Sequence, residues 1–244
     1  MTFEQPHTPE GPMAVIPARG GSKRIPKKNI RPFCGVPLLT RTIELLRATK
    51  LFQRIIVSTD DDEIAAVGKQ AGAEVPFRRP DDLSGDHVTT IAVVEHAVRA
   101  MTDARFQAEF VCCVYPGAAL ATVEDLTAAY SMLRDSSCDY VFPATAFQSS
   151  IHRALRMDAA GGVAMYWPQH ELTASQELEP AYHDAGQFYW GRREAWLERR
   201  SIYAANSRML LIPHYRVQDI DTLDDWTRAE MIYEISRREH PPAI

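Results

Sequence analysis

The sequence has no apolar run close to the roughly 20 residues that a membrane span requires. Its first twelve residues are polar and proline-rich and lack the apolar segment of a signal peptide, so residues 1–12 are predicted to be a flexible tail. Cysteine is scarce, and Cys34, Cys112, Cys113 and Cys138 show no CxxC spacing. Buried thiols are favoured over a metal site or disulfides. These absences predict a cytoplasmic protein that does not act at a membrane.

Two common nucleotide-binding motifs are also missing. The chain has neither a G-x-G-x-x-G dinucleotide fingerprint nor a G-x-x-x-x-G-K-[ST] loop. An excess of positive charge is absent as well, because 27 basic and 32 acidic residues give a net charge of −5. A nucleic-acid partner is therefore not expected, and any anion site must be a local basic patch.

What is present is an alternation of strand and helix patterns, which predicts one α/β domain over residues 13–244. Such alternation is typical of a doubly wound, mostly parallel sheet with helices on both faces. The predicted strands are Met13–Pro17, Arg54–Ser58, Ala73–Phe77, Phe110–Tyr115, Tyr140–Ala144, Gln187–Trp190 and Met209–Pro213. The predicted helices are Pro37–Thr49, Asp60–Gly72, Thr89–Met101, Thr122–Asp135 and a closing helix that begins after Thr222 and presents Trp226, Ala229 and Tyr233 on one face.

The alternation breaks after Thr145. Residues His152–Met157 and Val163–Trp167, joined by the Ala-Ala-Gly-Gly turn at 159–162, are predicted to form a hairpin. A polar stretch then continues to Pro180. We interpret 146–180 as an inserted β-rich arm rather than a further strand–helix unit.

The strongest chemical pattern is a basic loop that directly follows the first predicted strand. In doubly wound folds, ligands bind at the carboxyl edge of the sheet, where this loop begins. Gly20 and Gly21 let the backbone approach a ligand closely. Five cations fall within ten residues: Arg19, Lys23, Arg24, Lys27 and Lys28. A triphosphate is the natural partner for this density of charge, and a solvated basic loop is the alternative.

Several blocks resemble the cytidylyltransferases that activate sialic-type acids. They are Pro17-Ala-Arg-Gly-Gly-Ser-Lys23 with Lys28-Asn29, Val57-Ser-Thr-Asp-Asp61, Arg79-Pro-Asp-Asp-Leu-Ser84, Tyr182-His-Asp-Ala-Gly-Gln-Phe-Tyr-Trp190 and Arg216-Val-Gln-Asp-Ile-Asp221. The last two blocks are most similar to the branch that activates pseudaminic acid. The resemblance covers nearly the whole chain from Met13. It implies a Rossmann-like nucleotidyltransferase fold that transfers CMP from CTP to an acidic nine-carbon sugar and releases pyrophosphate.

The resemblance also implies roles for individual residues. Arg19, Lys23 and Lys28 would clamp the triphosphate with help from Gly20, Gly21 and the Ser22 hydroxyl. Asn29 and Arg79 would face the cytosine, and Thr89 or Thr90 would contact the nucleoside. The expected catalytic residues are Arg19, Lys28 and Asp221. For Arg79 alone, a surface ion pair is the alternative.

Asp219 and Asp221 flank Ile220 after a predicted strand, so a period of two puts both carboxylates on one face. Two carboxylates together with substrate phosphates make a plausible Mg²⁺ site. Helix capping is an equal alternative from the residues alone, because Thr222 follows directly. The resemblance favours metal binding.

The resemblance places the sugar among Tyr182, His183, Asp184, Gln187 and Tyr189, although His183 alone is as well explained as a structural histidine. It also implies that the 146–180 arm forms a homodimer in which the partner subunit closes the sugar pocket.

One loop departs from the family pattern. Gly117 stands where the family usually has Thr or Ser, and Ala119 stands where a proline follows. The altered loop, Pro116–Leu120, leaves open a different sialic-type or ulosonic acid, or a CTP-binding paralogue with weakened catalysis. A sugar-1-phosphate nucleotidyltransferase is disfavoured because its GxGTRL-like loop is missing.

Overall fold

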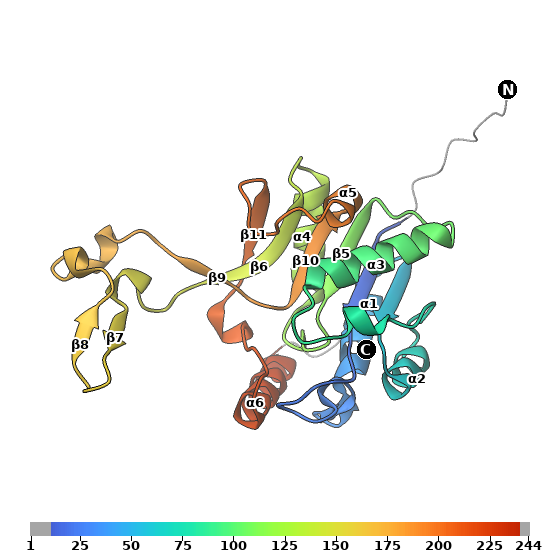
Figure 1. Ribbon diagram of the computed structural model, residues 1–244, viewed down its shortest axis with the longest axis horizontal. Coiled ribbons are helices and arrows are strands. Elements are labelled where there is room, and N and C mark those ends of the chain that lie inside the picture. The colour runs from blue at the N-terminus through green and yellow to red at the C-terminus, as the bar shows by residue number, and fades with distance from the viewer. Residues whose placement is uncertain (1–10, 240–244) are drawn as a thin grey trace.

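A central sheet of seven strands organises residues 11–239, the part of the chain that the computed structural model describes (Figure 1). The strands lie in the order β11-β6-β10-β5-β1-β4, with β9 paired to β6. Their bounds are β1 Met13–Pro17, β4 Arg54–Ser58, β5 Phe110–Val114, β6 Tyr140–Ala146, β9 Tyr182–Asp184, β10 Phe188–Arg192 and β11 Ser207–Leu211. Residues 1–10 of the predicted flexible tail lie outside the described residues. Pro12 of that tail accepts a hydrogen bond from the Gln53 amide, 2.9 Å away.

Helices cover both faces of this sheet, as predicted. Helices α1 (Leu38–Thr49), α2 (Asp62–Gln70) and α4 (Val123–Arg134) share a core with one face. Helices α3 (Thr90–Asp103) and α5 (Arg193–Leu197) share a core with the other. The adjacent thiols of Cys112 and Cys113 fall in different cores because successive strand residues point to opposite faces. The α/β fold class is confirmed.

The strands of the sheet do not all run in one direction. Strand β1 is parallel to β4 and β5, and β6 is parallel to β11. Strand β10 is antiparallel to both of its neighbours, β5 and β6, and β9 is antiparallel to β6. Phe188, at the start of β10, therefore pairs with Val114, at the end of β5. This reversal brings the segment before β10 to the carboxyl edge of the parallel strands.

The predicted strand Ala73–Phe77 is wrong. Only Glu74 pairs with the sheet, through an isolated parallel bridge to Ile56. Pro76 has no N–H with which to continue a ladder, which explains why the pairing stops. The prediction also missed α5, β9 and a two-strand ribbon formed by β2 (Pro32–Phe33) and β3 (Val36–Pro37).

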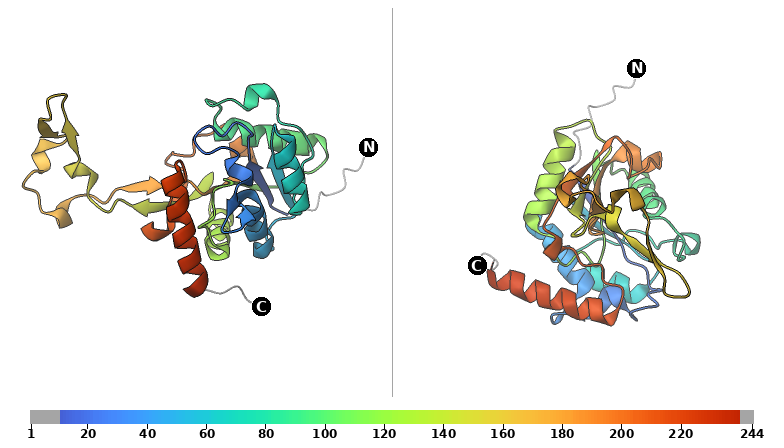
Figure 2. Two further views of the ribbon diagram at one scale, coloured as in Figure 1. Left: turned by 90° about the horizontal axis from the view of Figure 1, so that it is seen from below. Right: turned by 90° about the vertical axis from the view of Figure 1, so that its left-hand side faces the viewer.

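The arm projects from the body beyond the paired ends of β6 and β9 (Figures 1 and 2). Its hairpin is confirmed with shorter strands, β7 (Leu155–Met157) and β8 (Val163–Met165). His152 and Arg153 lie instead in a single 3-10 turn. No helix within residues 11–239 has the length and apolarity needed to cross a membrane.

Candidate active site

The basic loop after β1 is held in place by bonds from its own backbone and side chains. The Ala18 amide donates to the Ser58 carbonyl at 2.9 Å, and the Gly20 amide donates to an Asp60 carboxylate oxygen at 3.0 Å. The side-chain amide of Asn29 donates to the Arg19 carbonyl at 2.9 Å, which closes the loop on itself. These bonds fix where the cations of the loop can reach.

Gly20 is required by close packing. A Cβ atom at this position would lie 2.7 Å from an Asp61 carboxylate oxygen. Its N–H is already bonded to Asp60, so this glycine serves the loop by its small size. At Gly21, by contrast, an added Cβ would meet nothing within 4 Å.

The last helix, α6 (Leu223–Glu239), brings a second segment against the loop. Trp226 and Ala229 pack with Ile25, Phe33 and Ile220 in a small separate core, with Tyr233 at its border. The predicted buried face of this helix is confirmed. Because Ile220 is anchored there, the carboxylates on either side of it are carried to the basic loop.

The two segments enclose a cleft of about 220 Å³ at the carboxyl edge of the sheet. Tyr115, Pro116 and Gly117 line it from the end of β5, and Gly186 lines it from the turn before β10. The predicted site residues that line it are Arg19, Ser22, Lys23, Lys28, Asn29, Asp219 and Asp221. Arg24 and Gln218 complete its polar lining.

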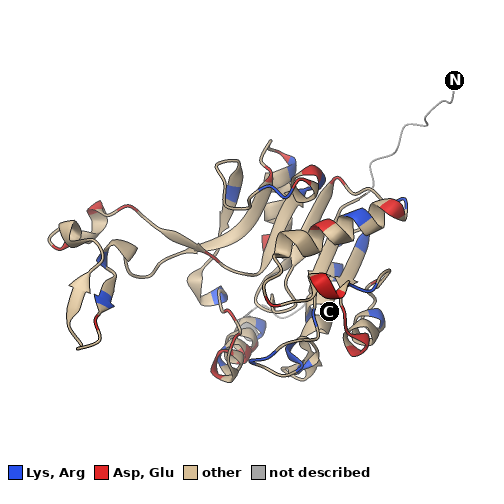
Figure 3. Ribbon diagram, viewed as in Figure 1, with Lys and Arg blue, Asp and Glu red and all other residues tan. Residues whose placement is uncertain are grey.

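Each cation of the loop faces a carboxylate from elsewhere in the chain. Asp86 receives Arg19 at 2.7 Å and Lys23 at 2.5 Å. Asp221 receives Arg24 at 2.5 Å and lies 4.0 Å from the Lys28 ammonium. Lys27 pairs with Glu63 of α2 at 2.6 Å and points away from the cleft lining. In Figure 3 basic and acidic segments accordingly alternate around this lower part of the body.

Burial and ion pairing lower the pKa of two of these groups, which disfavours the charge of Lys28 and favours that of Asp86. Burial lowers the pKa of the Lys28 ammonium, and the negative charges of Asp219 and Asp221 only partly oppose the shift. Hydrogen bonds from Lys23 and Arg19 lower the pKa of Asp86 to about 2. At neutral pH Asp86 therefore carries a full negative charge beside Arg19 and Lys23, the cations predicted to bind phosphate.

Helix capping does not account for Asp219 and Asp221. The cap of α6 is made by Thr222 and Asp225, whose side chains each accept the other's backbone amide at 2.9–3.2 Å. Asp219 and Asp221 instead line the cleft. Within residues 11–239 no three His, Cys, Asp or Glu side chains form a metal-binding group. Two carboxylates fit Mg²⁺, which takes its remaining oxygens from phosphates and water.

Of the residues expected near the nucleoside, Asn29 lines the cleft, whereas Arg79, Thr89 and Thr90 are not part of its lining. Arg79 is only 3% exposed, so a surface ion pair is excluded. Two of its guanidinium nitrogens donate to the hydroxyl and the carbonyl of Ser58. Burial lowers the pKa of Arg79 to about 10, Asp60 opposes this shift and nearby Arg19 adds to it. Arg79 is thus electrostatically coupled to the basic loop.

Of the two candidate threonines, Thr90 is the one connected to the cleft. Its hydroxyl lies 2.7 Å from the hydroxyl of Tyr115, which lines the cleft. Thr89 caps α3 by accepting the Ala92 amide at 3.3 Å.

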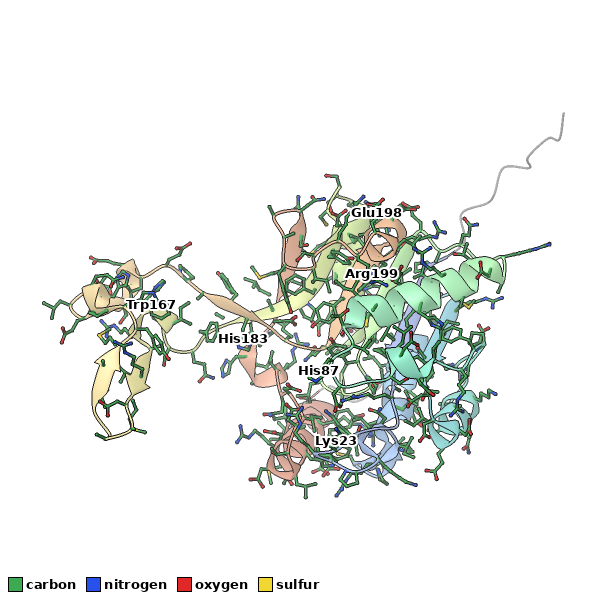
Figure 4. All side chains as sticks on the ribbon, in the orientation of Figure 1. Lys23, His87, Trp167, His183, Glu198 and Arg199 are labelled. Atoms are coloured by element: carbon green, nitrogen blue, oxygen red, sulfur yellow. The ribbon has the colours of Figure 1, made fainter. Side chains whose placement is uncertain are left out.

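The structure does not bring the five predicted sugar residues onto one surface. Tyr182 and His183 lie in β9 at the root of the arm, and His183 lines a second cavity of about 420 Å³ (Figure 4). Gln187 is buried and donates to the Arg216 carbonyl at 2.7 Å. Asp184 accepts the hydroxyls of Tyr189 at 2.7 Å and Tyr203 at 2.5 Å.

Asp184 nevertheless acts on the cleft through its neighbour. Its other carboxylate oxygen accepts the Gly186 amide at 2.6 Å, and Gly186 lines the cleft with a left-handed φ of 63°. Asp184, Tyr189 and Tyr203 therefore fix the turn that forms one wall.

Sequence reasoning missed four residues of this region: Asp86, Gly186, Tyr203 and Gln218. Gly186 and Gln218 stand inside the resembling blocks, which was the available signal. Asp86 has no local signal, because its partners are 67 and 63 residues earlier.

The whole described body matches one family model. That model carries the description Cytidylyltransferase and matches residues 13–239. The chain belongs to the cytidylyltransferase family. Cytidylyltransferases are nucleotidyltransferase enzymes, and this assignment agrees with the cation-rich cleft.

Individual relatives match the chain over nearly the same length. A pseudaminic acid cytidylyltransferase of Campylobacter jejuni serotype O:2 is 38% identical over 224 residues, which are 92% of this chain and 97% of the relative. A CMP-N,N'-diacetyllegionaminic acid synthase of Legionella pneumophila is 29% identical over 92% of this chain and 97% of its own length.

Two solved structures confirm the nucleotidyltransferase type of fold in this cytidylyltransferase. A CMP:2-keto-3-deoxy-manno-octonic acid synthetase complexed with CTP gives a TM-score of 0.68 at 15% identity, covering 94% of this chain and 100% of that one. A 4-diphosphocytidyl-2C-methyl-D-erythritol synthase from Anaerococcus prevotii gives 0.62 at 14% identity, covering 92% and 99%.

Proposed function

We propose that this cytidylyltransferase transfers CMP from CTP to the anomeric hydroxyl of an acidic nine-carbon sugar, with pseudaminic acid favoured. The observation that carries the proposal is the meeting of Arg19, Lys23 and Lys28 with two aspartates in one cleft. The 38% identity to a relative named as a pseudaminic acid cytidylyltransferase supports this choice of sugar.

The reaction joins two anions, so the main task of the cleft is to offset repulsion and to hold the reactants in line. The sugar hydroxyl oxygen forms a bond to the α-phosphorus as the bond from that phosphorus to the bridging oxygen breaks. The electron pair leaves with pyrophosphate, and the hydroxyl proton passes to solvent. The Arg19 guanidinium would donate two hydrogen bonds to phosphate oxygens, and Lys28 would supply a point charge. Ser22 would add a hydroxyl donor.

Asp219 and Asp221 would hold Mg²⁺ against the phosphates. When bound, the metal ion supplies positive charge to the non-reacting phosphate oxygens. Asp221 would then give up its contacts with Arg24 and Lys28, which frees both cations for the triphosphate.

Asn29 and the buried Arg79 would contact the cytosine. Thr90, whose hydroxyl is bonded to that of Tyr115, would contact the rest of the nucleoside. Cytosine offers acceptors where uracil carries an N–H, and a buried donor left unpaired costs about 1–3 kcal/mol. The sugar would lie beyond Gly117, against the Gly186 turn that Asp184 supports.

We further propose that the arm forms a homodimer. Leu155, Met157, Val163, Tyr166 and Leu172 are exposed along it, an apolar surface that association with a second copy would cover. Replacing 147–181 by a short turn is the direct test, because Ala146 and Tyr182 are paired neighbours that such a turn can join. A monomer in sedimentation analysis supports the proposal, and an unchanged dimer contradicts it.

We expect the reaction to take place in the cytoplasm. The four cysteines are free thiols, as is usual in reducing compartments.

The test of activity is pyrophosphate release from CTP and Mg²⁺ in the presence of pseudaminic acid, N-acetylneuraminic acid or an eight-carbon ulosonic acid. Turnover with pseudaminic acid above the other two is the expected result. Turnover with another acid corrects the sugar alone. Binding of CTP without turnover on any acid would leave a nucleotide-binding paralogue and overturn the proposed enzyme.

A further inference from the structure

Within residues 11–239, Asp86 is the one carboxylate that bridges two cations of the cleft without belonging to the proposed metal pair. Its two oxygens are divided between Arg19 and Lys23, at 2.7 and 2.5 Å. Both cations line the cleft, whereas Asp86 does not. The carboxylate thus approaches the cations from outside and holds them by the donor groups that phosphate oxygens would use.

The loop that carries Asp86 has few other attachments. The Ser84 amide and hydroxyl donate to Asp81 and Pro80, and the Val88 amide donates to Gly85, so these bonds are local. Within residues 11–239, the polar bonds that tie 84–88 to segments outside 80–88 are those of Asp86 to Arg19 and Lys23. In the view of Figure 4 the neighbouring His87 lies between Lys23 below it and Arg199 above it.

A triphosphate and Asp86 compete for the same donors. The carboxylate has a single negative charge, while a triphosphate brings several charges and many acceptor oxygens to the same place. Exposed ion pairs of this kind are weak, because water and salt screen them. The contact is therefore strong enough to order two long side chains and weak enough to be replaced by the substrate.

We propose that Asp86 occupies the place of a phosphate group in the ligand-free enzyme, and that binding of the triphosphate displaces it and releases the 84–88 loop. Asp86 is on this view a positioning residue: it keeps Arg19 and Lys23 directed to the cleft and lowers the affinity for nucleotide. The proposal rests on the proposed function in that it takes Arg19 and Lys23 as triphosphate ligands.

The test is calorimetric binding of inorganic tripolyphosphate to wild type and to Asp86→Asn. Loss of the competing charge is expected to lower Kd about 3- to 10-fold, the effect of removing two exposed ion pairs. Asp62→Asn is the matched control, because Asp62 also forms an exposed pair, with Arg78 at 2.5 Å, outside the cleft lining. The control should leave Kd unchanged. An equal or weaker affinity in Asp86→Asn overturns the proposal.

Hydrogen–deuterium exchange gives a second readout on the wild-type protein. Addition of tripolyphosphate should speed exchange at residues 84–88, and the same addition should change little in Asp86→Asn, where the loop is already released. Protection of 84–88 on binding would contradict displacement. In steady-state assays the substitution should act on KM for CTP rather than on kcat.

These experiments separate the two proposals. Turnover of CTP by wild type tests the function, whatever the effect of Asp86. Tripolyphosphate binding tests the displacement, even in a protein that transfers CMP to no acid.

Discussion

The ion pair between Arg216 and Asp125 joins the start of α4 to the segment that leads into the cleft, and it allows a quantitative prediction. The Arg216 guanidinium donates to both oxygens of Asp125, once at 3.0 Å and once through a shorter contact. The side chains are only 18% and 8% exposed. The Arg216 carbonyl also receives Gln187 from the turn before β10. One arginine therefore links three parts of the site region.

Replacing Arg216 by Met would keep most of its bulk and leave the Asp125 charge nearly buried with one remaining partner, the Thr122 amide at 3.1 Å. Losing charge-assisted bonds to a group of this kind costs about 1.5–3 kcal/mol. For a protein of this size, that cost corresponds to a fall in Tm of about 3–12 °C.

Calorimetry on Arg216→Met is the assay, with Arg134→Met as control. Arg134 pairs with Asp135 on the surface, with both side chains more than half exposed, so its loss should cost less than about 1 kcal/mol. The double variant Arg216→Met with Asp125→Asn should recover part of the stability, because no unpaired charge remains. A Tm for Arg216→Met within the error of the control would refute the reasoning.

Three further predictions concern the cleft. Because burial lowers the pKa of Lys28 below 10.5, its charge is lost at lower pH than in an exposed lysine. Lys28→Arg should therefore move the alkaline fall of kcat/KM to higher pH, because arginine keeps its charge. An unmoved pH profile would contradict this prediction. Gly117→Ala should raise the free energy of unfolding by about 0.4–1 kcal/mol, because an added Cβ meets nothing within 4 Å and the unfolded chain loses conformational freedom. A fall in Tm in thermal unfolding would contradict this prediction. Gly20→Ala should weaken CTP binding in calorimetry, because its Cβ would lie 2.7 Å from Asp61 and push the loop outward; unchanged affinity is the contrary result.

Local patterns predicted most of the elements well. The Met13–Pro17 and Arg54–Ser58 strands and the α4 capping box have the expected bounds, because each depends on residues close in sequence. The cleft lining from the basic loop followed for the same reason: the loop is one continuous segment. The apolar pattern of α6 correctly predicted which face of the helix is buried. That face packs against Ile220, which places the neighbouring Asp219 and Asp221 at the cleft.

Long-range features were not accessible in this way. The residues of β10 do not indicate that this strand runs antiparallel between β5 and β6, because the direction of a strand in the sheet depends on pairing partners far along the chain. Ala73–Phe77 has the composition of a strand, yet Pro76 limits it to a single bridge. The residues predicted to bind the sugar do not share one surface, because Gln187 and Tyr189 are buried in the protein.

The position of β10 has a consequence for synthesis on the ribosome. The sheet order places β4, β1 and β5 on one side of it and β6 and β11 on the other, with β10 as the hydrogen-bonded link. Until Arg192 has been added, β5 and β6 each present an open edge that can pair with another nascent chain. A ribosome pause after β10 has left the exit tunnel should therefore favour correct assembly, and a pause while β10 is still inside the tunnel should favour aggregation.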